Sequence, residues 1–250
     1  VRIVWRIGRD GGVRHGSLLQ GRTTLWTTVQ LRVSFTCDRR PQAAEARPLR
    51  AGTKRGVPTA ALQALNRIEL VVDEQPEREM HTVRELRVMR PYVRLPYEAV
   101  RGALALFVQE VLYKVLRGEA ADAQLFLFIE HALEAMDSGP DVSNFPMVFL
   151  LRLSGELGFL PAPPAQGEDR FDLKEGEFTQ GSTPHGHTLG PPLSGYLAEL
   201  LNEDLGALPR VSIPTDHRRA LLDHLLLYYR MHIEGLGELR SPAVLHQTLG

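Results

Sequence analysis

Residues 144–157 read NFPMVFLLRLSGEL, and this stretch decides the fold class of the C-terminal part of the chain. Apolar side chains occupy most of its positions, so the stretch has no extended polar face. A helix that is apolar nearly all round has to be covered by other elements, so it lies at the centre of a domain. Gly158 follows directly and suits the left-handed position that ends many helices. The stretch therefore predicts a buried central helix in an α-helical domain.

Five further segments predict helices around this central one. The first two carry apolar side chains at i, i+3, i+4 and i+7 spacing over several turns. Thr215 is placed to cap the strongest of the later helices, and Ser241 with Pro242 supplies a cap and a first-turn proline for the last. The predicted segments are residues 96–117, 123–137, 193–203, 215–234 and 243–249.

Between residues 57 and 92 the apolar pattern is that of β-strands. Residues 68–72 and 80–89 form two strand-like runs, and a charged, proline-containing connection separates them. Such a connection between two apolar runs predicts a β-hairpin. Residues 161–167 can form only a loop, and a smaller turn or hairpin is expected over residues 171–178, inside the Gly- and Pro-rich stretch that continues to residue 192.

Residues 1–55 differ from the rest of the chain in charge and in pattern. They hold 12 of the 29 Lys and Arg residues but 3 of the 30 Asp and Glu residues, a net charge of +9, and the remaining residues carry −10. Apolar alternation of the kind found in a half-buried strand is confined to residues 25–35. A basic end on an acidic body predicts either a polyanion-binding segment or a disordered basic arm, and both interpretations remain open here.

Composition excludes several classes of protein. Cys37 is the only cysteine, which rules out an internal disulfide framework and a zinc site built mainly from thiolates. The sequence has no run of about 18 apolar residues that would predict a membrane span, and its first residues lack the apolar block of a signal peptide. The sequence therefore predicts a cytoplasmic protein with no membrane partner.

Motifs for catalysis or cofactor binding are absent from the sequence. It contains no G-x-S-x-G, P-loop, G-x-G-x-x-G or H-E-x-x-H pattern. His185 and His187 lie in a flexible loop and have the side chains for a metal site, but no third ligand follows at a suitable spacing. An ordinary polar loop is the favoured interpretation. The sequence thus predicts no catalytic residue, no metal and no cofactor.

Arginines recur with aromatic residues near the end of the second strand-like run. Tyr92 and Tyr97 are interleaved with them, and this combination suits single-stranded DNA, because cations neutralise phosphates while rings stack on bases. A solvated strand face has the same pattern, and spacing alone favours that plainer interpretation. A second group of arginines lies on the predicted helix over residues 215–234. The candidate DNA contacts are Arg84, Arg87, Arg90, Arg94, Arg218, Arg219 and Arg230.

Several segments, taken together, resemble the RecO family of bacterial recombination-repair proteins, in its cysteine-poor branch. None of them is diagnostic alone, and their order and spacing over about 190 residues carry the resemblance. The segments are residues 70–85, 105–114, 144–161, 171–178, 225–233 and 240–245.

The resemblance implies an α+β protein: an N-terminal OB-fold β-barrel over residues 1–92 and an all-α helical domain over residues 93–250. It implies a DNA repair protein of the RecF recombination pathway that is not an enzyme. Such a protein binds and anneals single- and double-stranded DNA and, with RecR, helps load recombinase onto strands coated with single-strand-binding protein (SSB).

The acidic C-terminal tail of SSB is a further partner that the resemblance implies. A pocket for that tail requires apolar side chains ringed by a cation, which the central helix and the late helices are able to supply. Some family members carry a four-cysteine zinc site in the helical domain. The corresponding region of this chain, after Pro161, has no cysteine, so no zinc is expected.

One departure from the family pattern concerns residues 1–55. An OB-fold barrel should open with two strands around a tight turn, and this order is not visible there. Either the N-terminus has diverged, or the stretch is translated from a shifted reading frame or wrong start, which is the hypothesis favoured here. Reading the other two frames upstream of codon 55 decides between them. The alternative function is a helical protein-interaction or ligand-binding regulator without a DNA role, and a hydrolase that uses His185 and His187 is a third.

Overall fold

The structure is a computed structural model, and it describes most of the chain from residue 65 onward together with strand segments before it. The described ranges are residues 2–7, 13–14, 18–24, 28–37, 40–49, 65–73, 80–88, 90–116, 123–181, 183–207 and 209–248. For residues 2–49 and 68–87 the description covers the backbone. The chain forms two compact units, Val1–Tyr92 with Val111–Glu130, and Val93–Glu110 with His131–Gly250.

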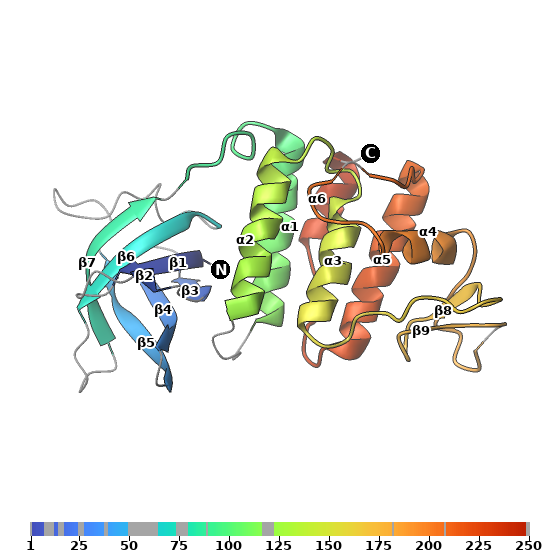
Figure 1. The fold of residues 1–250 in the computed structure, drawn as a ribbon, viewed down its shortest axis with the longest axis horizontal. Helices are drawn as coiled ribbons and strands as arrows, with labels where there is room; N and C mark the ends of the chain where they lie inside the picture. The colour runs from blue at the N-terminus through green and yellow to red at the C-terminus, as the bar shows by residue number, and fades with distance from the viewer. Residues whose placement is uncertain are drawn as a thin grey trace. The chain divides into compact units, whose positions relative to one another are not determined.

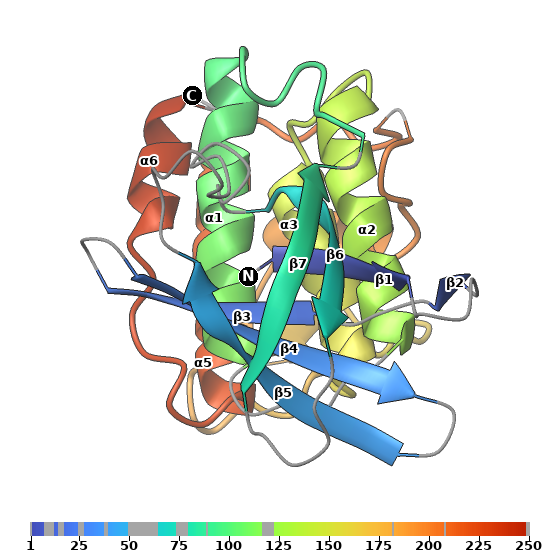
Figure 2. The ribbon, with the colours of Figure 1, turned by 90° about the vertical axis from the view of Figure 1, so that its left-hand side faces the viewer.

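The first unit contains one seven-stranded sheet (Figure 2). Its strands are β1 (Arg2–Ile7), β2 (Val13–Arg14), β3 (Leu18–Thr24), β4 (Thr28–Cys37), β5 (Arg40–Leu49), β6 (Arg67–Asp73) and β7 (Met80–Val88). Alternation predicted one strand before residue 55, over residues 25–35, whereas the backbone forms β1 to β5 there. Residues 25–27 lie outside the described residues, and the rest of that prediction falls in β4. Ladder hydrogen bonds join backbone groups whatever the side chains, so strands without clear alternation escape a pattern search.

The strand order of this sheet is β2-β1-β3-β4-β5-β7-β6, and an additional pairing of β1 with β6 joins distant members of the order. Strands β3, β4 and β5 form an antiparallel meander, and β5 then pairs in parallel with β7. Strands β6 and β7 are antiparallel, with a register shift between Val71 and Val72. This pairing confirms the hairpin that the sequence predicted.

All six predicted helices are present. They are α1 (Ala99–Val115), α2 (Ala123–Ser138), α3 (Phe145–Glu156), α4 (Leu193–Leu200), α5 (Thr215–His232) and α6 (Ser241–Thr248) (Figure 1). Helices α3 and α5 pack against each other, and α4 contacts both. Within the described part of the chain, no helix is both long enough and apolar enough to cross a membrane.

Helix α3 is the buried helix that the sequence predicted. Nine of its residues are buried, and Leu150 and Leu153 are fully enclosed. Gly158 ends it with a φ of +85°, as expected for a left-handed glycine. The Phe159 N–H donates to the carbonyl of Ser154 at 2.8 Å and the Gly158 N–H to that of Gly155 at 3.1 Å, which is the hydrogen-bond pattern of a Schellman motif.

Two predicted caps are wrong. Helix α5 is preceded by Pro214 in an extended conformation, and Thr215 is already helical, so its hydroxyl accepts a hydrogen bond from Arg218 Nη2 at 3.0 Å. Helix α6 begins at Ser241, whose N–H and hydroxyl both donate to Glu110 Oε2 on α1, at 2.8 and 2.6 Å. A carboxylate distant in sequence therefore accepts the hydrogen bonds of the donors in the first turn of α6. Residue spacing near the helix start cannot reveal such a partner.

A three-stranded sheet packs against α5. Its strands are β8 (Arg170–Asp172), β9 (Glu177–Thr179) and β10 (Thr188–Leu189), in the order β10-β8-β9. The β8–β9 pair confirms the predicted small hairpin. Phe171 and Phe178 are buried and pack 5.1 Å apart, and Phe171 contacts Tyr228 of α5 at 5.6 Å between ring centroids. The aromatic contacts anchor the β8–β10 segment to the helical unit.

Candidate functional site

The helical unit has a small pocket bordered by three helices. Its lining comes from the start of α3, the first half of α5 and the end of α6, and it has about 280 Å³ of empty space including its open mouth. Because this figure includes open solvent at the mouth, the pocket is a shallow hollow that suits one or two side chains and not a large cofactor. The lining residues are Ser143, Pro146, Met147, Thr215, Arg218, Arg219, Leu222, Leu245 and His246.

The floor of the pocket is apolar. Met147, Leu222 and Leu245 are 1%, 3% and 0% exposed, and they come from α3, α5 and α6 respectively. The three side chains belong to the packed core of the unit, so the floor is rigid. An apolar ligand side chain on this floor would be removed from water. Such burial contributes roughly 25 cal/mol of binding free energy per Å² of apolar surface.

Arg219 and His246, at the edge of the pocket, each have a buried nitrogen without a hydrogen-bond partner among the described residues. Arg219 donates from Nη2 to the carbonyl of His246 at 2.7 Å, and its Nη1 lies 3.9 Å from Asp216. Its buried Nε has no hydrogen-bond partner among the described residues. The same holds for the buried Nε2 of His246, which lies 3.5 Å from Asp223 without hydrogen-bond geometry.

A buried donor without an acceptor costs about 1–3 kcal/mol, so such atoms call for an explanation. Both residues line the pocket together with its apolar floor, and a carboxylate bound there would supply an acceptor for the guanidinium of Arg219. The pocket therefore suits a ligand with an apolar side chain and a negative charge next to it. Arg218 adds a second cation to the same edge and donates to Thr215 Oγ1.

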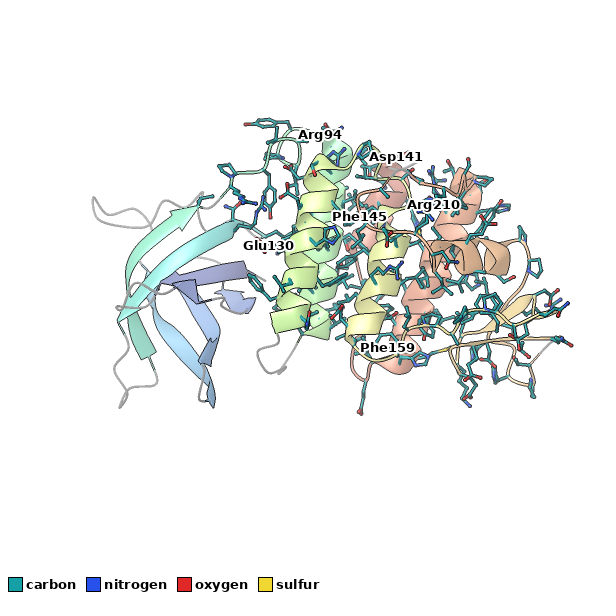
Figure 3. All side chains as sticks on the ribbon, viewed as in Figure 1. Arg94, Glu130, Asp141, Phe145, Phe159 and Arg210 are labelled. Atoms are coloured by element: carbon teal, nitrogen blue, oxygen red, sulfur yellow. The ribbon has the colours of Figure 1, made fainter. Side chains whose placement is uncertain are left out.

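Arg94, by contrast, is part of an interaction network at the start of α1, and Figure 3 labels it there. Its Nε donates to Glu98 Oε1 at 2.6 Å and its Nη1 to the carbonyl of Gly139 at 3.1 Å. Asp137 accepts three consecutive backbone N–H groups, those of Val93, Arg94 and Leu95, at 2.8–2.9 Å. The segment that leads into α1 is thus fastened to the end of α2.

Arg101 completes this network. It is 2% exposed, and its Nε donates to Glu98 Oε2 at 2.6 Å. Its two Nη atoms donate to the carbonyls of Met136 and Gly139, at the C-terminal end of α2. Hydrogen bonds from Arg94, and then from Arg101, hold the pKa of the Glu98 carboxyl below its ordinary value. We refer to Arg94, Glu98, Arg101, Asp137 and Gly139 as the α1–α2 network.

The other predicted DNA contacts are spread over the chain. Arg84 and Arg87 lie on β7, and their side chains are outside the described residues. Arg90 is exposed and has a φ of +38°, unusual for a residue other than glycine. Arg230 is exposed near the C-terminal end of α5, whereas Arg218 and Arg219 lie at the opposite end. The structure brings Arg218 and Arg219 together and leaves Arg230 well apart from them.

The two tyrosines interleaved with those arginines differ in their surroundings. The Tyr92 hydroxyl donates to the carbonyl of Leu65 at 2.6 Å, and the guanidinium of Arg67 lies 5.0 Å from the ring centroid. Arg67 also donates to the carbonyl of Arg90 at 3.1 Å. Tyr97 is 84% exposed. Tyr92 therefore has a structural role in its unit, and Tyr97 is the more exposed of the two.

The histidine loop that follows β9 is held by hydrogen bonds within the protein. His185 Nε2 lies 3.1 Å from Asp172 Oδ2, and its Nδ1 lies 3.2 Å from both the Thr183 hydroxyl and the backbone N of His187. Because the His187 N–H donates to Nδ1, we assign the ring proton to Nε2, where it faces Asp172. Among the described residues, no group of three or more His, Cys, Asp or Glu side chains is arranged to hold a metal ion.

Sequence reasoning anticipated the helices of the pocket and singled out Arg218 and Arg219, as DNA contacts, but missed the other lining residues. Met147, Leu222 and Leu245 are ordinary core positions in the sequence, and His246 lies in a helix of eight residues. The signal that could have found the site is the adjacent pair Arg218 and Arg219 next to a helix start. Their neighbours across the pocket come from segments far away in the chain, and sequence alone does not reveal such contacts.

Comparison with known proteins gives a consistent result. A family model described as "Recombination protein O C terminal" matches residues 97–242. A protein of Porphyromonas gingivalis is 29% identical over 189 residues, which cover 74% of this chain and 77% of that protein. A protein of Christiangramia forsetii is 29% identical over 188 residues, or 75% and 78% of the two chains. One of Phocaeicola vulgatus is 30% identical over 196 residues, or 78% and 81%.

All three of these relatives bear the name DNA repair protein RecO. The family model covers more than half of the present chain, and it includes every helix from α1 to α5 and most of the pocket lining. The three relatives extend the similarity to about three quarters of the chain. From these matches, the chain belongs to the RecO family.

Proposed function

We propose that this chain is a DNA repair protein of the RecF recombination pathway. It binds and anneals single- and double-stranded DNA and, with RecR, helps load recombinase onto SSB-coated single strands. The observation that carries the proposal is the family match over residues 97–242, together with relatives named DNA repair protein RecO. In this role the protein acts by binding rather than by bond-making chemistry, and it works in the cytoplasm, where the chromosome lies.

For the N-terminal part, residues 1–92, we propose an OB-fold barrel that carries the main DNA-binding surface. The meander β3-β4-β5, the parallel β5–β7 pair and the β6–β7 hairpin support it, because an OB-fold is a small Greek-key barrel built on such pairings. Arg84, Arg87 and Arg90 are the proposed contacts there. Residues 93–250 form the proposed helical domain, with Arg230 as a peripheral DNA contact.

We further propose that the pocket between α3, α5 and α6 binds the acidic C-terminal tail of SSB. The apolar floor suits an apolar side chain of the tail, and Arg218 and Arg219 suit its carboxylates. The unsatisfied Nε of Arg219 gives the strongest support, because a carboxylate of the tail would be its acceptor. In this proposal Arg218 and Arg219 contact the protein partner rather than DNA.

DNA binding is tested by fluorescence anisotropy with labelled single-stranded DNA at two salt concentrations. The affinity should fall steeply with salt, because phosphate contacts release counterions. The triple variant R84A/R87A/R90A should bind more weakly and with a shallower salt slope. R94A is the matched control, since Arg94 donates to Glu98 and Gly139. A wild-type protein that does not bind or anneal DNA would contradict the proposal.

Tail binding is tested separately, with a labelled peptide that carries the acidic C-terminal tail of SSB. R219A should reduce the affinity, and R230A on the same helix is the control because Arg230 is exposed and absent from the pocket lining. A second test replaces Leu222 by Ser, which makes the floor polar and should also weaken binding. Equal affinities of R219A and R230A would exclude this pocket as the tail site.

A further inference from the structure

His246 has a special position in the proposed tail pocket. It lies near the C-terminal end of α6, and its side chain is 28% exposed while its Nε2 is buried. The Nε2 atom is 3.5 Å from Asp223 Oδ1, beyond a good hydrogen bond. Its backbone carbonyl accepts the hydrogen bond from Arg219, so the two residues at this edge are directly connected.

The charged groups around His246 come from α5. Asp223 faces its ring, Arg219 lies against its backbone, and Asp216 lies 3.9 Å from Arg219. Arg218 lines the same pocket. Arginine stays charged throughout the accessible pH range, and exposed Asp side chains titrate about two units below neutrality or lower. His246 is the one histidine among the nine lining residues. Histidine is the residue type that changes its charge between about pH 5 and pH 8.

We infer that His246 makes ligand binding in this pocket proton-linked, so that an acidic peptide binds more tightly as the pH falls through the histidine range. The inference rests on the tail-binding function proposed above. A protonated imidazole has N–H donors on both ring nitrogens and a positive charge, so it adds a third cation to Arg218 and Arg219. A neutral imidazole offers a weaker, uncharged interaction to the same carboxylate.

Linkage fixes the sign of the effect. A bound carboxylate favours the protonated ring, so by reciprocity protonation favours the bound carboxylate to the same extent. The acidic side chains of the peptide have ordinary pKa values near 4, so they remain ionised above about pH 5.5 and do not cause the effect. The size of the change depends on how closely the bound carboxylate approaches the ring.

The experiment is an anisotropy titration of the full chain with the labelled SSB-tail peptide at about pH 5.5 and about pH 8, at constant ionic strength. We expect roughly fivefold tighter binding at the lower pH, which is the scale of one partly screened ion pair. H246Q should lose this gain at low pH. H224Q is the matched control, because His224 on α5 is likewise half-buried, is bonded to the carbonyl of Ala220, and is absent from the pocket lining.

A second measurement does not depend on any variant. Isothermal titration of the wild-type protein in two buffers of different ionisation enthalpy reports proton uptake on binding. A fraction of a proton should be taken up near neutral pH. Equal wild-type affinity at both pH values with no proton uptake, or an unchanged pH dependence in H246Q, would overturn the role of His246 and leave the tail pocket standing. No peptide binding at either pH would overturn both, while salt-sensitive DNA binding would show that the DNA role holds.

Discussion

Two arginine clusters in the helical unit differ in how fully their hydrogen bonds are satisfied. In the α1–α2 network, Arg94 and Arg101 donate to Glu98 and to carbonyls at the end of α2. At the pocket, Arg219 has one carbonyl partner, and its buried Nε has none among the described residues. The sequence predicted Arg94 and Arg219 alike as DNA contacts. The difference separates an arginine whose donors are used within the protein from one that has donor capacity left over.

The satisfied cluster should matter most for stability. Replacing Arg101 by Met keeps the side-chain volume but removes the side-chain donor to the Met136 carbonyl and one of the two arginine donors to the Gly139 carbonyl. We expect R101M to lower the free energy of unfolding by about 3 kcal/mol, the scale for breaking a buried charged network. Urea denaturation measures this change. A loss below about 0.5 kcal/mol, the usual size for surface substitutions, would show that the network is not structural.

Asp137 offers a second test of the same cluster. D137N retains one carbonyl oxygen for the three backbone N–H groups of residues 93–95, but it removes the negative charge and one acceptor. We expect a loss of about 2 kcal/mol in unfolding free energy, because hydrogen bonds to charged groups contribute about 1.5–3 kcal/mol each. S138A, at the exposed neighbouring residue, is the control and should change stability little. Similar stabilities of the two variants would contradict this assignment.

The unsatisfied cluster should behave in the opposite way. R219A should leave the unfolding free energy within about 0.5 kcal/mol of the wild type, since the side chain is partly exposed. It should weaken binding of the SSB-tail peptide roughly tenfold, the scale of one charge-assisted hydrogen bond. Urea denaturation and peptide anisotropy on the same preparation separate the two effects. A strong loss of stability in R219A would contradict this contrast, because Arg219 would then stabilise the fold as the α1–α2 network does.

The smallest expected effect concerns acid stability. The pKa of Glu98 is lowered in the folded protein by Arg94 and Arg101, so its ionised form stabilises the fold above the ordinary pKa of glutamate. That contribution is lost as the pH falls through the lowered folded pKa. Denaturation between about pH 5 and pH 3 should therefore show a steeper loss in the wild type than in E98Q. Parallel curves for the two proteins would indicate that Glu98 gains nothing from its two arginines.

Sequence reasoning was most successful where the information is local. Apolar spacing together with cap and proline signals predicted all six helices, and Gly158 ends α3 as predicted because a left-handed terminus favours a residue without Cβ. It failed at Thr215 and Ser241, whose hydroxyls interact with Arg218 and Glu110 instead of capping their own helices. The partner of Ser241 came from tertiary structure, whereas that of Thr215 lies one turn along its own helix.

The candidate site was less predictable than the fold for the same reason. Arg94 lies in an arginine- and tyrosine-rich stretch, and only the position of Gly139 and Glu98 shows that its donors are in use. Leu222 and Leu245 meet at the pocket floor although neither stands out from other core leucines in the sequence. Arg84 and Arg87, whose side chains lie outside the described residues, stay predictions.

The carboxylate of Glu110 accepts the hydrogen bonds of Ser241 at the first turn of α6. This contact has a consequence for folding during translation. Helix α6 contributes Leu245 and His246 to the pocket, yet its start is fixed by a residue translated long before it. During synthesis, α1 emerges with its acceptor ready, while the pocket lacks one wall until α6 follows. A chain that ends before residue 241 therefore has most of its helices but lacks the α6 wall of the pocket.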